Sequence, residues 1–143
     1  MKETFLYPTK IQSIASIRSD LKAFAENQKV PAPELRQITI IIEELFSKIV
    51  KTAFDGKGDH VLEISISKTN TEILIEIIDD GYPFNPTDHS PFQASNPTST
   101  DEEDMGLSLI KAFSDSIQYT REEQKNILLI QKIIRSQANI ERS

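Results

Sequence analysis

The chain has 143 residues, of which 38% are hydrophobic and 27% are charged, with a formal net charge of −6 and no cysteine. This length and composition predict a single domain with one sizeable core. The acidic balance and the lack of a Lys/Arg cluster argue against nucleic acid as the main partner. No apolar run approaches roughly 20 residues and no signal-peptide pattern opens the chain, so we expect a cytoplasmic protein without a membrane span. The lack of cysteine excludes disulfides, thiolate metal sites and cysteine nucleophiles.

The first half of the chain reads as a strand followed by two helices. ETFLYPT at 3–9 predicts a short strand that ends at Pro8 and suits a sheet edge. The next segment predicts an amphipathic helix with Ser13 available as its N-cap. A second, longer helix has Pro33 in its first turn and runs to about Phe54. Its apolar positions recur every three or four residues: Leu35, Ile38, Ile42, Leu45 and Ile49.

Two strands and a long loop come next. HVLEISISK at 60–68 and TEILIEIID at 71–79 alternate apolar and other residues, as half-buried strands do, and 69–71 reads as the hairpin turn between them. Residues 82–100 carry four prolines and are rich in Ser, Thr and Asn, so they cannot form a helix or a central strand. We expect a loop or lid over about 82–105.

A third helix is predicted from about Asp101 to Phe113, with Thr100 and Glu103 spaced as a capping box and Leu107 on its buried side. Two strands joined by the turn REEQK, and a short tail, complete the chain at 116–120, 126–134 and about 136–143. Hairpin strands with helices between them predict an α+β fold. We expect one domain over residues 1–143, a two-layer sandwich of one mixed, mostly antiparallel sheet with about three helices on one face.

Two groups of residues carry candidate chemistry. Glu44 and Lys48 lie one turn apart on the second helix, beside its apolar seam, and point the same way. The turn DDGYPF places Asp79 shortly before Gly81 and Phe84. Two ordinary alternatives stay open, because Asp-Gly is common in turns that end strands, and a Glu–Lys pair at this spacing is also a surface ion pair worth about 0.3–0.5 kcal/mol.

Three motifs make the chain resemble the bacterial anti-sigma factor serine kinases, which belong to the ATPase superfamily of gyrases, Hsp90, histidine kinases and MutL. EELFSK at 43–48 stands in the place of the family's helix box, and DDGYPF at 79–84 in the place of its D-x-G-x-x-F turn. MGLSLIKAF at 105–113 stands in the place of the lid end and the following helix. The resemblance covers nearly the whole chain in the same element order, and it implies the histidine kinase/Hsp90-like, Bergerat-type ATPase fold.

The resemblance also implies ATP as the ligand. Asp79 would accept a hydrogen bond from the adenine amino group, and Gly81 would let the backbone lie close to the base. Glu44 would be the catalytic base that accepts the proton of an attacking serine hydroxyl. The motifs carry three further nucleotide-binding positions: Phe84, Gly106 and Leu107.

Two features depart from the family. Where the family has an asparagine that helps to hold Mg²⁺, this chain has Lys48, whose ammonium has no lone pair and cannot ligate a cation. Lys48 can instead contact phosphate oxygens, which keeps it as a nucleotide-binding candidate, or pair with Glu44. At the lid end only Gly106 remains of a glycine-rich turn, and the acidic run 101–104 precedes it. The cations available to offset that run are Lys51, Lys111 and Arg121.

By resemblance, the chain is an anti-sigma regulator that binds a sigma factor to silence transcription and uses ATP to phosphorylate an antagonist protein on serine. The alternative is a partner-binding module of the same fold that binds no nucleotide and switches partners without catalysis; Lys48 and the acidic lid end motivate it. A third reading, a detached histidine-kinase-like fragment, is disfavoured because no phospho-accepting histidine helix is evident. Family members commonly form homodimers, and the strand around Phe5–Tyr7 is a candidate edge for one.

Overall fold

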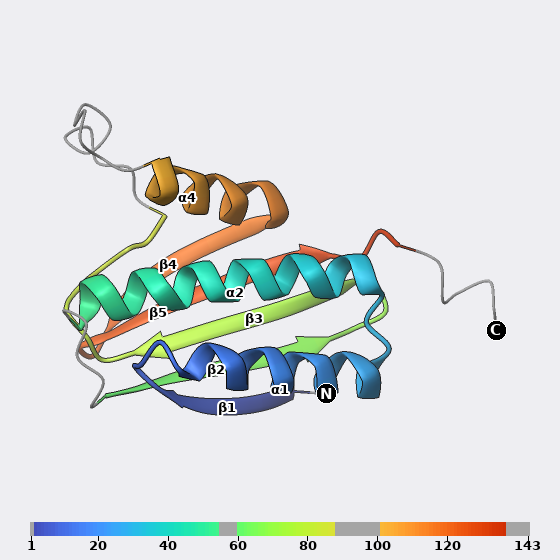
Figure 1. Cartoon of the computed structure of the whole chain (residues 1–143), viewed down its shortest axis with the longest axis horizontal. Helices are drawn as coiled ribbons and strands as arrows, with labels where there is room; N and C mark the ends of the chain where they lie inside the picture. Colours follow the sequence, from blue (N-terminus) through green and yellow to red (C-terminus); the bar gives the residue numbers. More distant parts are fainter. Residues whose placement is uncertain (1, 55–59, 88–100, 137–143) are drawn as a thin grey trace.

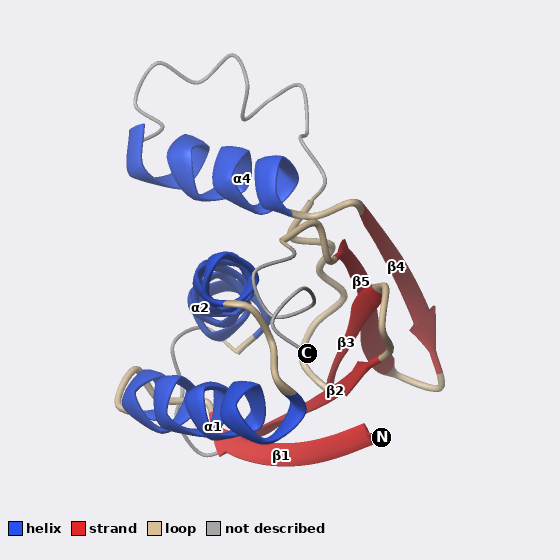
Figure 2. Cartoon of the chain, turned by 90° about the vertical axis from the view of Figure 1, so that its right-hand side faces the viewer, coloured by secondary structure: helices blue, strands red, loops and turns tan. Residues whose placement is uncertain are grey.

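The computed structural model describes residues 2–54, 60–87 and 101–136, and it shows one sheet covered by one layer of helices (Figures 1 and 2). The described sheet has five strands in the order β1-β2-β3-β5-β4. These strands are β1 Lys2–Pro8, β2 Val61–Lys68, β3 Glu72–Asp79, β4 Ser116–Glu122 and β5 Lys125–Ile133. The predicted α+β class is confirmed, with β1 at an edge, and every described strand pair is antiparallel rather than mixed.

Three helices in the described part of the chain lie on one face of the sheet, as Figure 2 shows: α1 Ser13–Gln28, α2 Ala32–Ala53 and α4 Asp101–Phe113. α2 lies in the middle, with α1 on one side of it and α4 on the other (Figure 1). Within the described residues, no helix combines the length and the apolar character that a membrane span needs.

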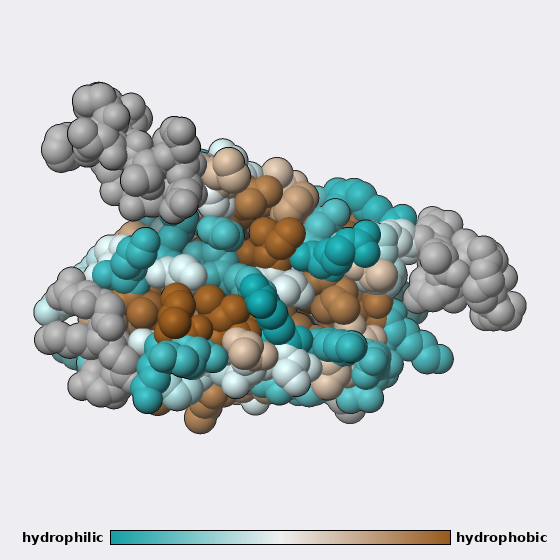
Figure 3. Space-filling view, in the orientation of Figure 1, coloured by the Kyte–Doolittle hydropathy of each residue, from teal (hydrophilic) through white to brown (hydrophobic). Residues whose placement is uncertain are grey.

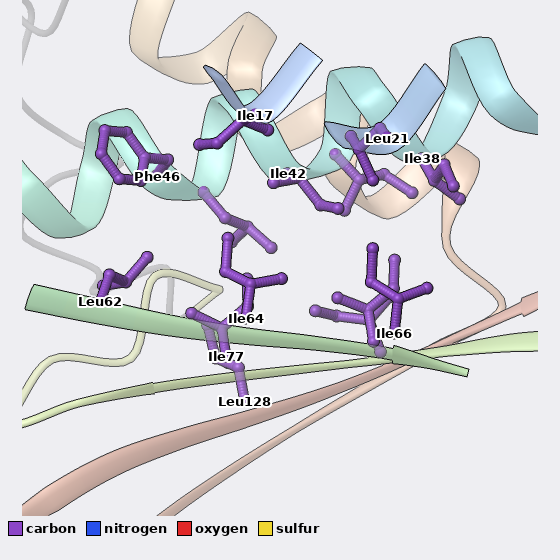
Figure 4. Close-up of a cluster of buried hydrophobic side chains, with 14 of the residues drawn as sticks. Ile17, Leu21, Ile38, Ile42, Phe46, Leu62, Ile64, Ile66, Ile77 and Leu128 are labelled. Carbon is purple, nitrogen blue, oxygen red and sulfur yellow. The ribbon is translucent and has the colours of Figure 1, made fainter. Parts of the chain in front are cut away.

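The core is packed around α2. Its apolar stripe faces the sheet, and Figure 4 shows side chains from α1 and α2 converging on those of three strands. The labelled members of this cluster are Ile17, Leu21, Ile38, Ile42, Phe46, Leu62, Ile64, Ile66, Ile77 and Leu128. Burying each such side chain contributes roughly 1.5–3 kcal/mol. Of the predicted seam, only Leu35, in the first turns of α2, stays partly buried.

The start of α1 corrects one prediction. Gln12 occupies the N-cap position without a side-chain capping bond, and the predicted cap, Ser13, is the first helical residue. The Ser13 hydroxyl donates instead to the carbonyl of Pro8, 2.7 Å away, because the chain turns back on itself between β1 and α1. Ser13 therefore fastens the strand to the helix rather than capping the helix.

The β4–β5 connection is shorter than the predicted five-residue turn REEQK. Strand pairing continues to Glu122 and Lys125, so only Glu123 and Gln124 form the loop. Both have left-handed backbones, with φ of 49° and 66°, as the tight hairpin turns that match strand twist require. The usual Asn or Gly signal for such a turn is missing here, and so the sequence suggests a looser one.

Some predictions fall outside the described residues. They concern the lid over 88–100, the Thr100–Glu103 capping box and the tail from 137 onward. Residues 82–87 are irregular, as expected for the start of the predicted lid, and α4 begins at Asp101 as predicted.

Candidate functional site

The first half of the candidate site is a buried polar network at the end of β3. Asp79 is the last residue of β3, lies on the inner face of the sheet and is 4% exposed. Its Oδ1 accepts hydrogen bonds from the backbone N–H of Gly81 and from Nδ2 of Asn126, each at 2.9 Å. Asn126 stands directly opposite Asp79 because the antiparallel register pairs the end of β3 with the start of β5.

Asn126 is the hub of this network, and sequence reasoning missed it. Its Nδ2 also donates to the carbonyl of Tyr82 at 2.8 Å. Its Oδ1 accepts from the N–H of Phe84 at 3.2 Å, from the hydroxyl of Tyr119 and from Arg121 Nη1 at 3.1 Å. Both donors of this amide are used and its oxygen is fully engaged, so Asn126 holds the DDGYPF turn in one conformation.

Arg121, on β4, is hydrogen-bonded to the same turn. Its Nη1 donates to the carbonyl of Gly81 at 2.8 Å as well as to Asn126. The sequence suggested Arg121 as one of three cations that could offset the acidic lid end, whereas the structure places its Nη1 at the turn beside Asp79. A cavity of about 350 Å³ borders the turn and is lined by Gly81, Tyr82 and Arg121 among others.

Burial raises the pKa of Asp79 above its ordinary value. The hydrogen bonds from Asn126 and Gly81 and the charge of Arg121 act the other way, and the charge of Asp80 adds to the upward shift. The net shift of the pKa is upward because burial destabilises the charged form of the carboxylate more than the two hydrogen-bond donors stabilise it. Asp79 is therefore a buried carboxyl whose ionised form depends on partners that donate to it.

Gly81 makes a close approach that only glycine permits. A Cβ on Gly81 would lie 2.6 Å from the carbonyl oxygen and 2.7 Å from the Cβ of Ala53, the last residue of α2. The N–H of Tyr82 donates to the same Ala53 carbonyl at 3.0 Å. In this structure the close approach of Gly81 is thus to α2, and its predicted role beside an adenine base stays a prediction. The contact fixes the turn against the end of the central helix.

The second half of the site lies where α2 meets α4. Glu44 and Lys48 are both half-buried on α2, as neighbours one turn apart. A Cβ built on Gly106 of α4 would overlap with Oε1 of Glu44 and lie 3.7 Å from Cε of Lys48. The structure therefore brings three predicted residues together, although they are up to 62 positions apart in the sequence. Gly106 allows the two helices to meet over the Glu44 carboxylate.

The described residues around this cluster show one ion pair, which joins Glu43, the residue before Glu44 on α2, to Arg18 of α1. The alternative in which Glu44 pairs with Lys48 stays open. Leu107 is buried in α4, and Phe84 packs against the core.

The two halves are joined by α2. Ala53 follows Glu44 by nine positions, which corresponds to about 14 Å along an α-helix, with Lys48 roughly midway. The Asp79 network and the Glu44–Gly106 contact therefore lie against different points of the same helix.

The comparisons with known proteins agree with the fold. The sequence model of one protein family, described as the histidine kinase-like ATPase domain, matches residues 7–132. No curated protein matches the chain.

Among solved structures, the RsbU and RsbW domains of a Mycobacterium tuberculosis protein match with a TM-score of 0.62 at 12% identity, over 95% of this chain and 33% of that one. A chain of the SiaB–SiaC complex from Pseudomonas aeruginosa matches with a TM-score of 0.57 at 14% identity, over 92% of this chain and 89% of that one. The histidine kinase domain of a blue-light activated kinase from Erythrobacter litoralis matches with a TM-score of 0.53 at 13% identity, over 89% and 61%. At these identities the likeness concerns the fold.

Proposed function

Since the chain belongs to the family of histidine kinase-like ATPase domains, we propose that it is an ATP-binding, partner-switching regulator of the anti-sigma type. In this role it sequesters a sigma factor and phosphorylates an antagonist protein on serine. The nucleotide lies along α2, with the adenine amino group on Asp79 and the phosphates at the ammonium of Lys48. Glu44 serves as the base for the serine hydroxyl.

One observation carries the nucleotide part of this proposal. Asp79 is almost fully buried, yet both of its hydrogen bonds within the described residues end on Oδ1. Oδ2 is thus left as an acceptor, on a carboxylate whose direction is fixed by Gly81 and Asn126. Among the described residues, the buried side-chain atom without a hydrogen-bond partner is Oε1 of Glu34, so Oδ2 of Asp79 is open enough to accept from water or from a ligand donor. The exocyclic amine of adenine is such a donor.

Lys48 changes what the phosphate end can do. The ammonium offers three donors and a positive charge to phosphate oxygens, but it has no lone pair with which to hold Mg²⁺. The residue at this position does not fit the metal, so the proposal includes no step that depends on Mg²⁺ at Lys48. In this proposal the ammonium of Lys48 neutralises phosphate charge in place of the metal ion.

The partner-binding half is supported by the neighbours of similar fold. Two of them come from an RsbU–RsbW protein and from a SiaB–SiaC complex, which are assemblies of such a domain with another domain or protein. We extend partner binding to this chain as a proposal, with a sigma factor and an antagonist as the partners. We also propose a homodimer through the exposed edge strand β1, where Leu6 is 65% exposed. Light scattering that finds only monomer would contradict the dimer.

A second function is favoured by the contact between Gly106 and Glu44. Because Gly106 of α4 lies directly over Oε1 of Glu44, α4 covers this oxygen and restricts how a substrate hydroxyl can approach it. A module that keeps the fold and exchanges partners without phosphoryl transfer is consistent with this contact and with Lys48.

Titration calorimetry separates the two functions. ATP is titrated into the wild-type protein and into Lys48→Asn, with Mg²⁺ and then with EDTA. The ATP-binding proposal expects binding by the wild type that is indifferent to Mg²⁺, and binding by Lys48→Asn that strengthens when Mg²⁺ is added. If neither protein binds ATP at millimolar concentration, the kinase proposal is wrong and the partner-binding module remains.

A further inference from the structure

A groove opens between the start of α1 and the C-terminal half of α2, away from the Asp79 network. It has a volume of about 440 Å³ and is lined by residues 9–12 and by Ser47, Val50 and Lys51. On α2, Val50 and Lys51 come three and four positions after Ser47, so the three side chains lie on one face of the helix. We call this feature the α1–α2 groove.

The groove presents apolar surface on a rigid frame. Ile11 is 60% exposed, and Val50 lines the opposite wall. Figure 3 shows hydrophobic surface along the C-terminal half of α2, on the side that faces the start of α1. Ile11 is held outward because Lys10, Ser13 and Ile14 each donate a backbone hydrogen bond within the turn that contains it. An isoleucine fixed in water beside an apolar wall gains free energy when another apolar side chain covers it.

The rim of the groove is positive, although the whole chain carries a net charge of −6. Lys10 and Lys51 stand at the groove, one from each wall. Glu43, one turn before Ser47 on α2, is held in a two-bond ion pair by Arg18 of α1. The charge of Glu43 is therefore offset locally, and the two lysines set the sign of the rim.

We propose that the α1–α2 groove binds an acidic, amphipathic segment of a partner protein. An apolar side chain of that segment covers Ile11 and Val50, and carboxylates on either side of it meet Lys10 and Lys51. The proposal rests on the partner-binding half of the proposed function and is independent of nucleotide binding, because Asp79 and Glu44 do not line the groove.

The probe is a fluorescein-labelled synthetic peptide with leucines on one helical face and glutamates on the other, followed by fluorescence anisotropy. A second peptide has every glutamate replaced by lysine. We expect the acidic peptide to bind about tenfold more tightly than the basic one, and Ile11→Asp to weaken that binding by about tenfold or more. Lys51→Glu should reduce or reverse the preference for the acidic peptide, since it changes the sign of half the rim.

Matched controls make the outcome decisive. Lys111→Glu changes an exposed lysine on α4, and Leu129→Asp changes an exposed apolar residue on the strand β5; both should leave peptide binding unchanged. Equal binding of the two peptides, or equal loss in all four variants, overturns the proposal. So does self-association that Ile11→Asp abolishes while neither peptide binds, because the groove is then an interface between two copies.

ATP titration into the same variants separates the proposals. ATP binding without peptide binding refutes the groove and leaves the nucleotide proposal standing. Peptide binding without ATP binding supports the groove and the non-catalytic module.

Discussion

The substitution Asp79→Asn should separate nucleotide recognition from folding. An asparagine keeps Oδ1 as the acceptor for the N–H of Gly81 and for the amide of Asn126. It replaces Oδ2 by an NH₂ group, which would face the amino group of adenine, donor against donor. The structural bonds on one oxygen are thus retained while the proposed ligand contact on the other is lost.

The magnitudes follow from hydrogen-bond energies. A bond to a charged group contributes about 1.5–3 kcal/mol, so its loss should weaken ATP binding by about 10- to 150-fold. Folding should respond differently. Asp79→Asn leaves both donors satisfied and should be at least as stable as the wild type at pH 7. Asp79→Ala leaves two buried donors without an acceptor and should lose about 2–5 kcal/mol.

The pH dependence has a definite sign. The pKa of Asp79 is raised in the folded state, by burial above all. Below pH 3.8 the group is protonated in both the folded and the unfolded state and contributes nothing. As pH rises above 3.8 the unfolded chain ionises first, so the folded state loses stability until the raised pKa is passed. The stability of Asp79→Asn relative to the wild type should therefore increase over this window and then level off.

Urea unfolding followed by circular dichroism at pH 3.5 to 7.5, with calorimetric ATP titration at pH 7, measures both effects. The expected pattern is a stable Asp79→Asn that has lost ATP affinity, beside a destabilised Asp79→Ala. The reasoning is refuted if Asp79→Asn binds ATP as tightly as the wild type, or if it unfolds as easily as Asp79→Ala at pH 7.

Three further substitutions test packing, two of them at the site and one between β1 and α1. Gly81→Ala brings a Cβ against the backbone oxygen of Ala53, and we expect a loss of about 1–3 kcal/mol in urea unfolding. Gly106→Ala meets only the mobile end of Glu44, so its unfolding free energy should change little while any phosphotransfer rate, measured with radiolabelled ATP, falls. Tyr7→Phe removes a buried hydroxyl that donates to a carboxylate of α1 at 2.7 Å, and should lower the unfolding free energy by about 1 kcal/mol. Equal destabilisation by the two glycine substitutions would contradict this account of the site.

Periodicity predicted the fold because it reports burial directly. The spacing of apolar residues on α2 and the alternation along β2 and β3 reflect which side chains face the core, and these elements appear where expected. The errors are local. A serine suited to capping was assigned to the cap of α1, but tertiary contact gave its hydroxyl a different acceptor at Pro8. The tight β4–β5 turn lacks the Asn or Gly residues that usually signal a two-residue hairpin turn.

The candidate site was predictable only in part. Short sequence motifs contain four of its residues: Glu44, Asp79, Gly81 and Gly106. Asn126 lies in none of them, and its importance comes from lying opposite Asp79 in the register of two strands that are 47 positions apart. Pairing of that kind depends on how the sheet is assembled, and a single sequence holds no local signal for it.

The two ends of the proposed site are constrained by different forces. The base end is built into the core: Asp79 is buried and Gly81 is pressed against α2, so most changes there must disturb folding. The phosphate end lies where α2 meets α4, and Lys48 is only half-buried there. A substitution there can alter metal and phosphate chemistry at little cost in stability. Stability measurements therefore report on the base end, and only ligand and phosphotransfer assays can decide what Lys48 does.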